Sequence, residues 1–236
     1  MTISNIRASL LRLAAAFIVS NTNASPVNLV SNGSFEAGNS NFTSDYSYSP
    51  GVNSTEGEYT VRTNPFPWNG FFISTGDHTS GTGLMMVANG SPVSGSVVWQ
   101  SEPIAVTNGP NYFFEAFVNN VCCTSAYTGP NSPSILEFSL SVNGGAAVSL
   151  GTITTNLGLA GTWEGLSTQF ASAAAGNAVL SLINRNTSPG GNDFAVDDIY
   201  FGTESTVIPP LPEPVTLSLL GLGLAGLGFS RSRKKL

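Results

Sequence analysis

Few residues in this chain of 236 residues have side chains that could carry out catalysis. The single histidine, His78, lies in a polar run of Thr, Gly and Ser beside Ser80, where it could act as a general base. A lone histidine in such a run is typical of a surface position. The sequence has no Gly-x-Ser-x-Gly elbow, His-Glu-x-x-His pair or phosphate-binding loop. With fourteen acidic residues, a carboxylate pair of the glycosidase kind is expected by chance. We therefore interpret the chain as a non-enzyme.

The only two cysteines, Cys122 and Cys123, are adjacent in the sequence. An oxidising compartment favours bonded cysteines, and neighbouring cysteines can close only a strained ring. A vicinal disulfide would mark a rigid loop, whereas a free pair would invite crosslinks between chains. The sequence leaves the reduced and the vicinal state open.

Aromatic side chains are the natural floor for sugar rings, whose C–H faces lie against π surfaces. Trp99 and Trp163 lie in predicted strands, which favours a position in the core. Trp68 lies in a loop rich in Pro and Asn, where it could either present a ligand platform or cover the edge of the core. The predicted ligand-binding residues are Trp68, Asn69, Asp77 and Tyr127.

Charge is distributed very unevenly along the chain. Of eight basic residues only Arg62 and Arg185 lie in the central part of the sequence, together with all the acidic residues except Glu213. Nucleic-acid affinity rests on Lys and Arg contacts with phosphates. A central part with only two basic residues cannot make such contacts, which excludes nucleic acid as a partner. The aromatic content and the many Ser, Thr, Asn and Gly residues indicate a folded extracellular β-protein with a polar surface.

The central part reads as short strands separated by turn signals. Apolar and polar residues alternate cleanly over 135–142, and Asn143-Gly144-Gly145 supplies the positive-φ residues of a tight hairpin. We expect strands over residues 27–30, 58–62, 84–88, 96–100, 112–118, 135–142, 148–153, 162–170, 178–183 and 194–201. This spacing predicts an all-β fold, an antiparallel β-sandwich or jelly roll.

Both ends of the chain indicate export. Arg7 and Arg12 lead into an apolar run that ends in small residues, which predicts a signal peptide over residues 1–24. We expect the β-sandwich domain over 25–205 and a Pro-rich linker over 206–214. Residues 215–236 are predicted to form a transmembrane helix with a basic tail, whose charges should stay on the cytoplasmic side.

The sequence Pro212-Glu213-Pro214, the apolar run after it and the terminal Arg/Lys cluster resemble the PEP-CTERM sorting signal of Gram-negative bacteria. The resemblance covers about the last 25 residues. It implies recognition by an exosortase, which removes the helix near the motif. The precursor would be anchored in the inner membrane before the domain passes to the cell surface or extracellular matrix. The alternative is a plain tail anchor whose prolines stiffen a linker.

Two further patches resemble the first and last strands of the galactose-binding-like jelly roll of carbohydrate-binding modules. They are Asn32-Gly33-Ser34-Phe35-Glu36 and Asp197-Asp198-Ile199. The resemblance implies that these strands run close together and hold a structural Ca²⁺. Carboxylates are the ligands that Ca²⁺ prefers. The predicted ligands are Glu36 with Asp197 or Asp198, although both aspartates could instead be solvated charges at a strand end. Strand alternation would turn the two aspartates to opposite faces unless a bulge intervenes, so the sequence leaves open which one faces the ion.

Two functions follow from these patterns. The first is an exported protein, processed by exosortase, that binds or organises the extracellular polysaccharide of a biofilm matrix. The alternative is a structural matrix or adhesion component with no specific glycan ligand.

Overall fold

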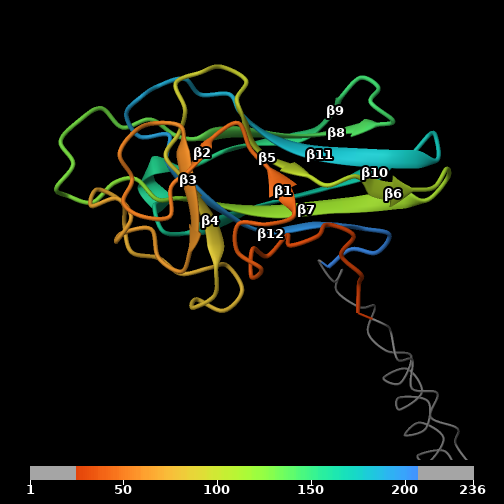
Figure 1. The fold of residues 1–236 in the computed structure, drawn as a ribbon, viewed down its shortest axis with the longest axis horizontal. Helices are drawn as coiled ribbons and strands as arrows, with labels where there is room; N and C mark the ends of the chain where they lie inside the picture. The colour runs from red at the N-terminus through yellow and green to blue at the C-terminus, as the bar shows by residue number, and fades with distance from the viewer. Residues whose placement is uncertain (1–24, 207–236) are drawn as a thin grey trace, which may run out of the picture.

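Two β-sheets packed face to face account for nearly all the regular structure in the computed structural model, which describes residues 25–206 (Figure 1). The strands are β1 (Phe42–Thr43), β2 (Ser47–Tyr48), β3 (Glu58–Arg62), β4 (Met85–Ala88), β5 (Val97–Ser101), β6 (Ile104–Val106), β7 (Asn111–Asn120), β8 (Ile135–Val142), β9 (Val148–Thr154), β10 (Trp163–Ala171), β11 (Gly176–Asn184) and β12 (Phe194–Gly202). A short 3₁₀ helix, Leu157–Leu159, lies between β9 and β10. The predicted all-β sandwich is confirmed.

The strand order places β12, the last strand of the described residues, in the middle of a sheet. One sheet has the order β1-β5-β11-β8-β9, with β6 also paired to β11. The other has the order β10-β7-β12-β4-β3-β2. All strand pairs are antiparallel except β2 with β3, so the prediction of a wholly antiparallel sandwich is wrong at this edge.

Every predicted strand except that over 27–30 is present, and β8 has the expected bounds. Asn143 and Gly144 both have positive φ, as the predicted hairpin requires. The short strands β1, β2 and β6 were not predicted, because runs of two or three residues carry too little periodicity to stand out from a loop.

Residues 27–30 lie beside the last strand without forming a strand themselves. The amide group of Leu29 donates to the carbonyl oxygen of Phe201 at 2.8 Å. The Asn28 side chain makes the next two bonds, donating to the Ile199 carbonyl at 2.8 Å and accepting from the Phe201 N–H at 3.0 Å. A side chain thus replaces part of a backbone ladder. The predicted closeness of the two ends of the domain is confirmed, and Figure 1 shows the first and last described residues near each other.

The main core fills the space between the two sheets. Inward-facing residues of both sheets pack there, among them the fully buried Trp99, Phe114 and Leu136. This confirms the core position expected for Trp99. Fully burying each large apolar side chain contributes roughly 1.5–3 kcal/mol.

A second, smaller core lies against β4, with Met85 and Val87, and against the neighbouring Ala195 of β12. There the loop after β3 packs Trp68 and Phe72 against these residues. Trp163 of β10 is partly buried against this second core rather than in the main one. The loop residues that follow β3 are therefore fixed by apolar packing.

Within residues 25–206 the structure contains no helix long and apolar enough to cross a membrane. The predicted signal peptide, the transmembrane helix of 215–236 and the motif Pro212-Glu213-Pro214 lie outside the described residues, as does all but the first residue of the predicted linker.

Candidate functional site

A β-bulge in β12 brings two neighbouring aspartates to one site. The register between β12 and β7 shifts between Asp197 and Tyr200. Asp198 adopts a left-handed φ of 48°, and the extra residue of the bulge is accommodated there. Regular alternation would have sent the two carboxylates to opposite faces. With the bulge, both Asp197 and Asp198 line one hollow, so both face the site at which Glu36 was expected.

Glu36 reaches this hollow from the segment that precedes β1. Phe35 has a φ of 58°, unusual for a bulky residue, and its ring is fully buried in the main core. Gly33 lies so close to β12 that an added Cβ would collide with the carbonyl oxygen of Ile199. The Ile199 N–H donates to the Gly33 carbonyl at 2.9 Å, which fixes this approach. The tight turn thus positions Glu36 next to the bulge.

Asp77, predicted as a ligand-binding residue near Trp68, lies in this hollow instead. Its Oδ2 accepts from the Ser80 N–H at 2.8 Å, and its Oδ1 accepts from the Gly83 N–H at 2.7 Å and the Ser80 hydroxyl at 2.9 Å. Burial raises the pKa of the Asp77 carboxyl, but these hydrogen bonds outweigh burial and hold its pKa below the usual value. Asp77 therefore closes its own loop as an ionised carboxylate.

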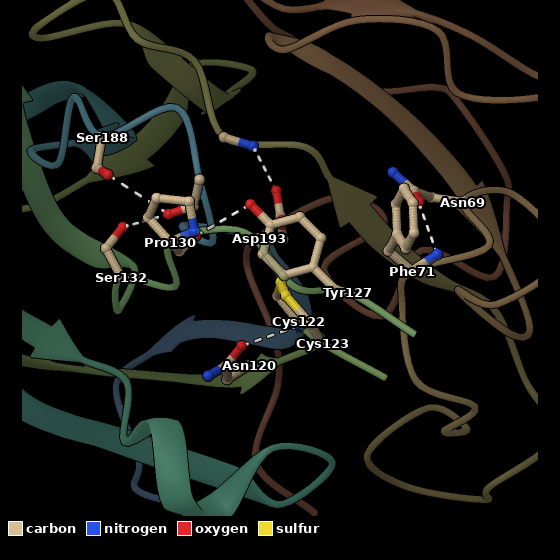
Figure 2. The surroundings of a disulfide bond; sticks show 12 residues. Asn69, Phe71, Asn120, Cys122, Cys123, Tyr127, Pro130, Ser132, Ser188 and Asp193 are labelled. Atoms are coloured by element: carbon tan, nitrogen blue, oxygen red, sulfur yellow. Dashed lines mark hydrogen bonds between the residues drawn. A yellow bond between two sulfur atoms is a disulfide. The ribbon is translucent and has the colours of Figure 1, made fainter. Parts of the chain in front are cut away.

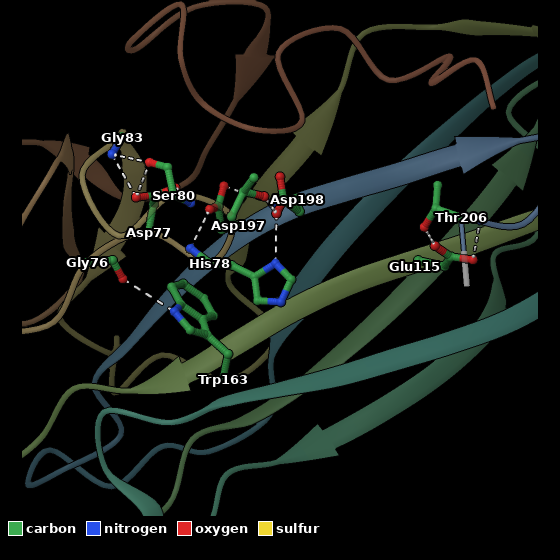
Figure 3. Close-up of polar contacts among 11 residues, drawn as sticks. Gly76, Asp77, His78, Ser80, Gly83, Glu115, Trp163, Asp197, Asp198 and Thr206 are labelled. Carbon is green, nitrogen blue, oxygen red and sulfur yellow. Dashed lines mark hydrogen bonds and ion pairs between the residues drawn. The ribbon is translucent and has the colours of Figure 1, made fainter. Parts of the chain in front are cut away.

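The hollow is strongly acidic, and we call it the acidic hollow. It measures about 370 Å³, and the described residues of its lining include no basic one: they are Ser34, Glu36, Asp77, Thr79, Ser80, Thr82, Gly83, Asp197 and Asp198. Figure 3 shows Asp77, Asp197 and Asp198 of this lining. Asp197 is only 1% exposed and accepts from the backbone N–H groups of His78 at 2.9 Å and Asp198 at 2.8 Å. Burial, together with the negative charge of Asp198, raises the pKa of Asp197 to about 7. A cation bound nearby would stabilise the ionised form of Asp197.

The donor set of the acidic hollow suits a hard cation in kind. Carboxylate, hydroxyl and carbonyl oxygens are ligands of Ca²⁺. Within the described part of the chain, however, no three of the carboxylates of Glu36, Asp77, Asp197 and Asp198 bring ligand atoms within 4.8 Å of one another. The arrangement therefore offers at most two of these carboxylates at once, and further oxygen ligands would have to complete the shell.

His78 lines a neighbouring hollow, on the other side of Asp198 and Thr79, and forms no catalytic pair with Ser80. Its Nδ1 lies 2.8 Å from the Asp198 carboxylate, which also accepts from the Thr79 hydroxyl. The imidazole stacks on Phe117 of β7, with 3.5 Å between ring centroids. The Ser80 hydroxyl donates a hydrogen bond to Asp77 and not to His78. His78 is therefore held by an aromatic ring below and a carboxylate beside it.

A second hollow lies at the loops that cover β3 and β4. It measures about 550 Å³, and we call it the amide hollow; its lining is Val52, Asn53, Ser54, Thr55, Glu56, Asn69, Gly70, Phe71 and Asn89. Asn53 Oδ1 accepts from the side-chain amides of both Asn69 and Asn89 at 2.8 Å. Glu56 Oε2 is buried and has no hydrogen-bond partner among the described residues. Burial raises the pKa of Glu56 to about 7.

An exposed aromatic pair borders the amide hollow. Phe71 is 48% exposed, and its ring meets Tyr127 edge-on with 5.4 Å between ring centroids. The Tyr127 hydroxyl donates to the Pro130 carbonyl at 3.0 Å, which fixes the orientation of its ring. Figure 2 shows the hydrogen bond from Tyr127 to Pro130 and the one from the Phe71 N–H to the Asn69 side chain. Such edge-to-face pairs are stable arrangements of two rings.

The structure divides the four predicted ligand-binding residues. Asn69 lines the amide hollow and Tyr127 borders it, whereas Asp77 lies in the acidic hollow. Trp68 is fully buried in the second core, and its indole N–H donates to the Ser49 carbonyl at 2.9 Å. It presents no ring face to a ligand, so of the two alternatives the core position is the one observed.

Phe71 and Glu56 line the amide hollow but were not among the predicted ligand-binding residues. Phe71 follows Asn69-Gly70, a turn signal that could have marked it as an aromatic residue at a loop tip. No sequence signal marks Glu56, because its burial depends on loops from distant parts of the chain.

Cys122 and Cys123 form the vicinal disulfide, one of the two states that the sequence left open. Cys122 is 2% exposed. The carboxylate of Asp193 lies next to the pair.

No protein-family model and no curated protein sequence matches the chain. Solved carbohydrate-binding modules are among its structural neighbours. One is TmCBM61 in complex with β-1,4-galactotriose, with 14% identity and a TM-score of 0.47, covering 75% of this chain and 99% of that one. Another is a Family 16 Carbohydrate Binding Module-2, with 13% identity and a TM-score of 0.42, covering 74% and 99%.

A third neighbour is the CBM22-1-GH10 part of the Clostridium thermocellum xylanase 10B, complexed with xylohexaose. It shows 19% identity and a TM-score of 0.40, and the match covers 64% of this chain but only 25% of that one. Likenesses this distant do not assign a ligand to this chain.

Proposed function

We propose that this chain is an exported protein whose jelly-roll-type sandwich, of the galactose-binding-like kind, binds extracellular polysaccharide without transforming it. The observation that carries the proposal is the amide hollow bordered by Phe71 and Tyr127. A site for a small ligand typically combines apolar or aromatic walls with a few convergent polar groups. The amide hollow has both, on loops that the second core holds in place.

The chemistry of this hollow matches that of a sugar. A sugar hydroxyl is both a donor and an acceptor, and a side-chain amide offers both functions in one plane. Asn69 and Asn89 bring such amides to the hollow, and Glu56 also lines it. The exposed face of Phe71 can pack against the C–H face of a sugar ring. An acidic domain with neutral amides at its site suits a neutral glycan better than an anionic one.

The sorting signal extends the proposal to the route of the protein. A precursor held in the inner membrane by residues 215–236 would be cut by an exosortase near Pro212-Glu213-Pro214. The domain would then work at the cell surface or in the extracellular matrix of a biofilm. This part of the proposal is supported by the order of motif, apolar run and basic tail.

We further propose that the acidic hollow binds one structural Ca²⁺. Supporting this is the shared hollow of Glu36, Asp197 and Asp198, of which two could bind an ion at once, with no basic residue among the described residues of its lining. Burial raises the pKa of Asp197, and a divalent ion in the hollow would offset the cost of ionising this carboxyl. The ion would tie the segment before β1 to the last strand. It would therefore support the fold rather than contact the glycan.

A glycan array followed by calorimetry on the binding glycan tests the main proposal. Phe71→Ala should weaken binding at least tenfold, about 1.4 kcal/mol, because the stacking face is lost. Phe66→Ala is the matched control, since Phe66 is 47% exposed but does not line the amide hollow. Equal losses in both variants, or none in either, would place binding elsewhere. If no glycan binds, with or without Ca²⁺, a structural or adhesive role becomes the better account.

A further inference from the structure

Two sulfur atoms and a carboxylate meet just beyond the end of β7. The Sγ atoms of Cys122 and Cys123 and a carboxylate oxygen of Asp193 all lie within 4.8 Å of one another. No other trio of His, Cys, Asp or Glu in residues 25–206 meets this condition. The backbone holds the two segments together, because the Val121 N–H donates to the Asp193 carbonyl at 3.1 Å. The Cys122 N–H donates to the Asn120 side chain at 3.0 Å, which fixes the first cysteine (Figure 2).

Among the described residues, the Asp193 side chain has fewer partners than a buried carboxylate usually has. It is 6% exposed, and the hydrogen bond that it accepts comes from the Gly90 N–H at 3.2 Å. The ion pairs of the described residues join other acids, Asp198 and Glu137. Burial raises the pKa of Asp193 well above its usual range, and the charge of Glu56 raises it further. Buried charges are normally paired or coordinate a metal.

We propose that reduction of the Cys122–Cys123 disulfide opens a site for a thiophilic divalent cation, such as Zn²⁺ or Cd²⁺, on the two sulfurs and the Asp193 carboxylate. A dithiol reductant supplies the two electrons: the S–S bond breaks, two thiols form, and the reductant closes into its own disulfide. The cation then replaces the two thiol protons and any proton on Asp193. In the disulfide form neither sulfur is a thiolate, so the site is closed.

The arrangement fits the dimensions of such a site. Tetrahedral Zn²⁺ takes sulfur at about 2.3 Å and carboxylate oxygen at about 2.0–2.2 Å, which separates the ligand atoms by about 3.4–3.8 Å. The three ligand atoms lie within 4.8 Å of one another, and breaking the bond between the two sulfurs lets these move apart to that separation. Cys123 is partly exposed whereas Cys122 and Asp193 are buried, so the fourth position opens on the Cys123 side. Three protein ligands with one open position is a usual arrangement for zinc.

Cadmium titration of the full chain, monitored by the ultraviolet thiolate-to-metal absorption, tests the proposal. The dithiol-reduced protein should bind one equivalent of Cd²⁺, and the oxidised protein should bind at least 100-fold more weakly. Re-oxidation of the loaded protein should release the metal, a readout that needs no variant. Metal retained after the disulfide has re-formed, or no absorption change on titrating the reduced protein, would overturn the proposal.

Variants separate the carboxylate from the sulfurs. Asp193→Asn keeps the shape of the side chain and should weaken Cd²⁺ binding tenfold or more in the reduced protein. Glu102→Gln is the matched control, because Glu102 is an exposed acid outside the trio, and it should leave affinity within twofold. Cys122→Ser should abolish the absorption band, with folding checked by circular dichroism. Equal affinities of Asp193→Asn and wild type would reduce the site to a dithiol alone and refute the proposed ligand set.

Discussion

The buried Asp197 carboxylate should make the domain less stable as pH rises, and Asp197→Asn should remove that effect. Below pH 3.8 the group is protonated in both the folded and the unfolded state and contributes no pH dependence. Between 3.8 and about 7 the unfolded chain releases its proton while the folded chain keeps it. The free energy of unfolding therefore falls with rising pH across this window and stays low above it.

The size of the effect follows from the raised pKa. A carboxyl whose pKa rises from 3.8 to about 7 on folding lowers the free energy of unfolding by about 4 kcal/mol above both values. The Asn side chain does not ionise, but it has one oxygen for the two N–H groups, of His78 and Asp198, that Asp197 serves. Leaving one buried donor unpaired costs roughly 1–3 kcal/mol. The cost of the unpaired donor varies little with pH. The difference between wild type and Asp197→Asn in the pH dependence of the free energy of unfolding therefore reports the ionisation of Asp197 alone.

Urea unfolding in EDTA between pH 4 and pH 8, followed by the fluorescence of the buried tryptophans, measures this slope. The fall in wild type should exceed that in Asp197→Asn by about 4 kcal/mol. A fall should remain in the variant, because Glu56 and Asp193 also have raised pKa values. Glu102→Gln, the same chemical change on the exposed connection between β5 and β6, controls for the lost charge.

Parallel profiles for wild type and Asp197→Asn would refute the reasoning, since they would mean that Asp197 ionises as readily in the folded domain as in the unfolded chain. Adding Ca²⁺ to wild type provides a second check. A cation in the acidic hollow favours the ionised carboxylate, so saturating Ca²⁺ should flatten the profile without any mutation.

Further predictions concern the cation, the turn and the tail. Ca²⁺ at a hundredfold excess over Kd should raise the melting temperature by about 5–10 °C, and Asp198→Ala should abolish this increment; an unchanged melt in EDTA would exclude the ion. Gly33→Ala should destabilise by about 2 kcal/mol or more in urea unfolding, because its Cβ meets the Ile199 carbonyl; wild-type stability would show that the turn relaxes freely. Mass spectrometry should find the mature surface form ending near Pro214, and an intact Leu236 terminus would contradict sorting.

The strands could be predicted because their signals are local. Alternation over 135–142 and the Asn143-Gly144 turn need no knowledge of the rest of the chain, and both are confirmed. The segment over 27–30 misled the prediction because the Asn28 side chain replaces backbone bonds to the last strand. A hydrophobic pattern does not distinguish a strand from an extended segment held in that way.

The candidate sites were predicted less completely because burial and register are set by distant contacts. The sequence predicted that Glu36 lies near the last strand. It could not predict the bulge that places both Asp197 and Asp198 in one hollow. The turn residues around Trp68 left open whether it binds a ligand or covers the edge of the core, and the small core against β4 buries it. The neighbouring Phe71 became the exposed ring instead.

The central position of β12 sets the order in which this protein can fold. β12 lies between β7 and β4, so before residues 194–202 are synthesised the sheet has an open gap in its middle. The hydrogen bond from Leu29 to Phe201 joins residues that are separated by almost the whole sequence of the domain. Pairings so distant in sequence form slowly, because the intervening chain must be ordered first. A chain that still lacks β12 cannot complete this sheet, so we expect the strands before it to reach their final packing only after the last strand has been made.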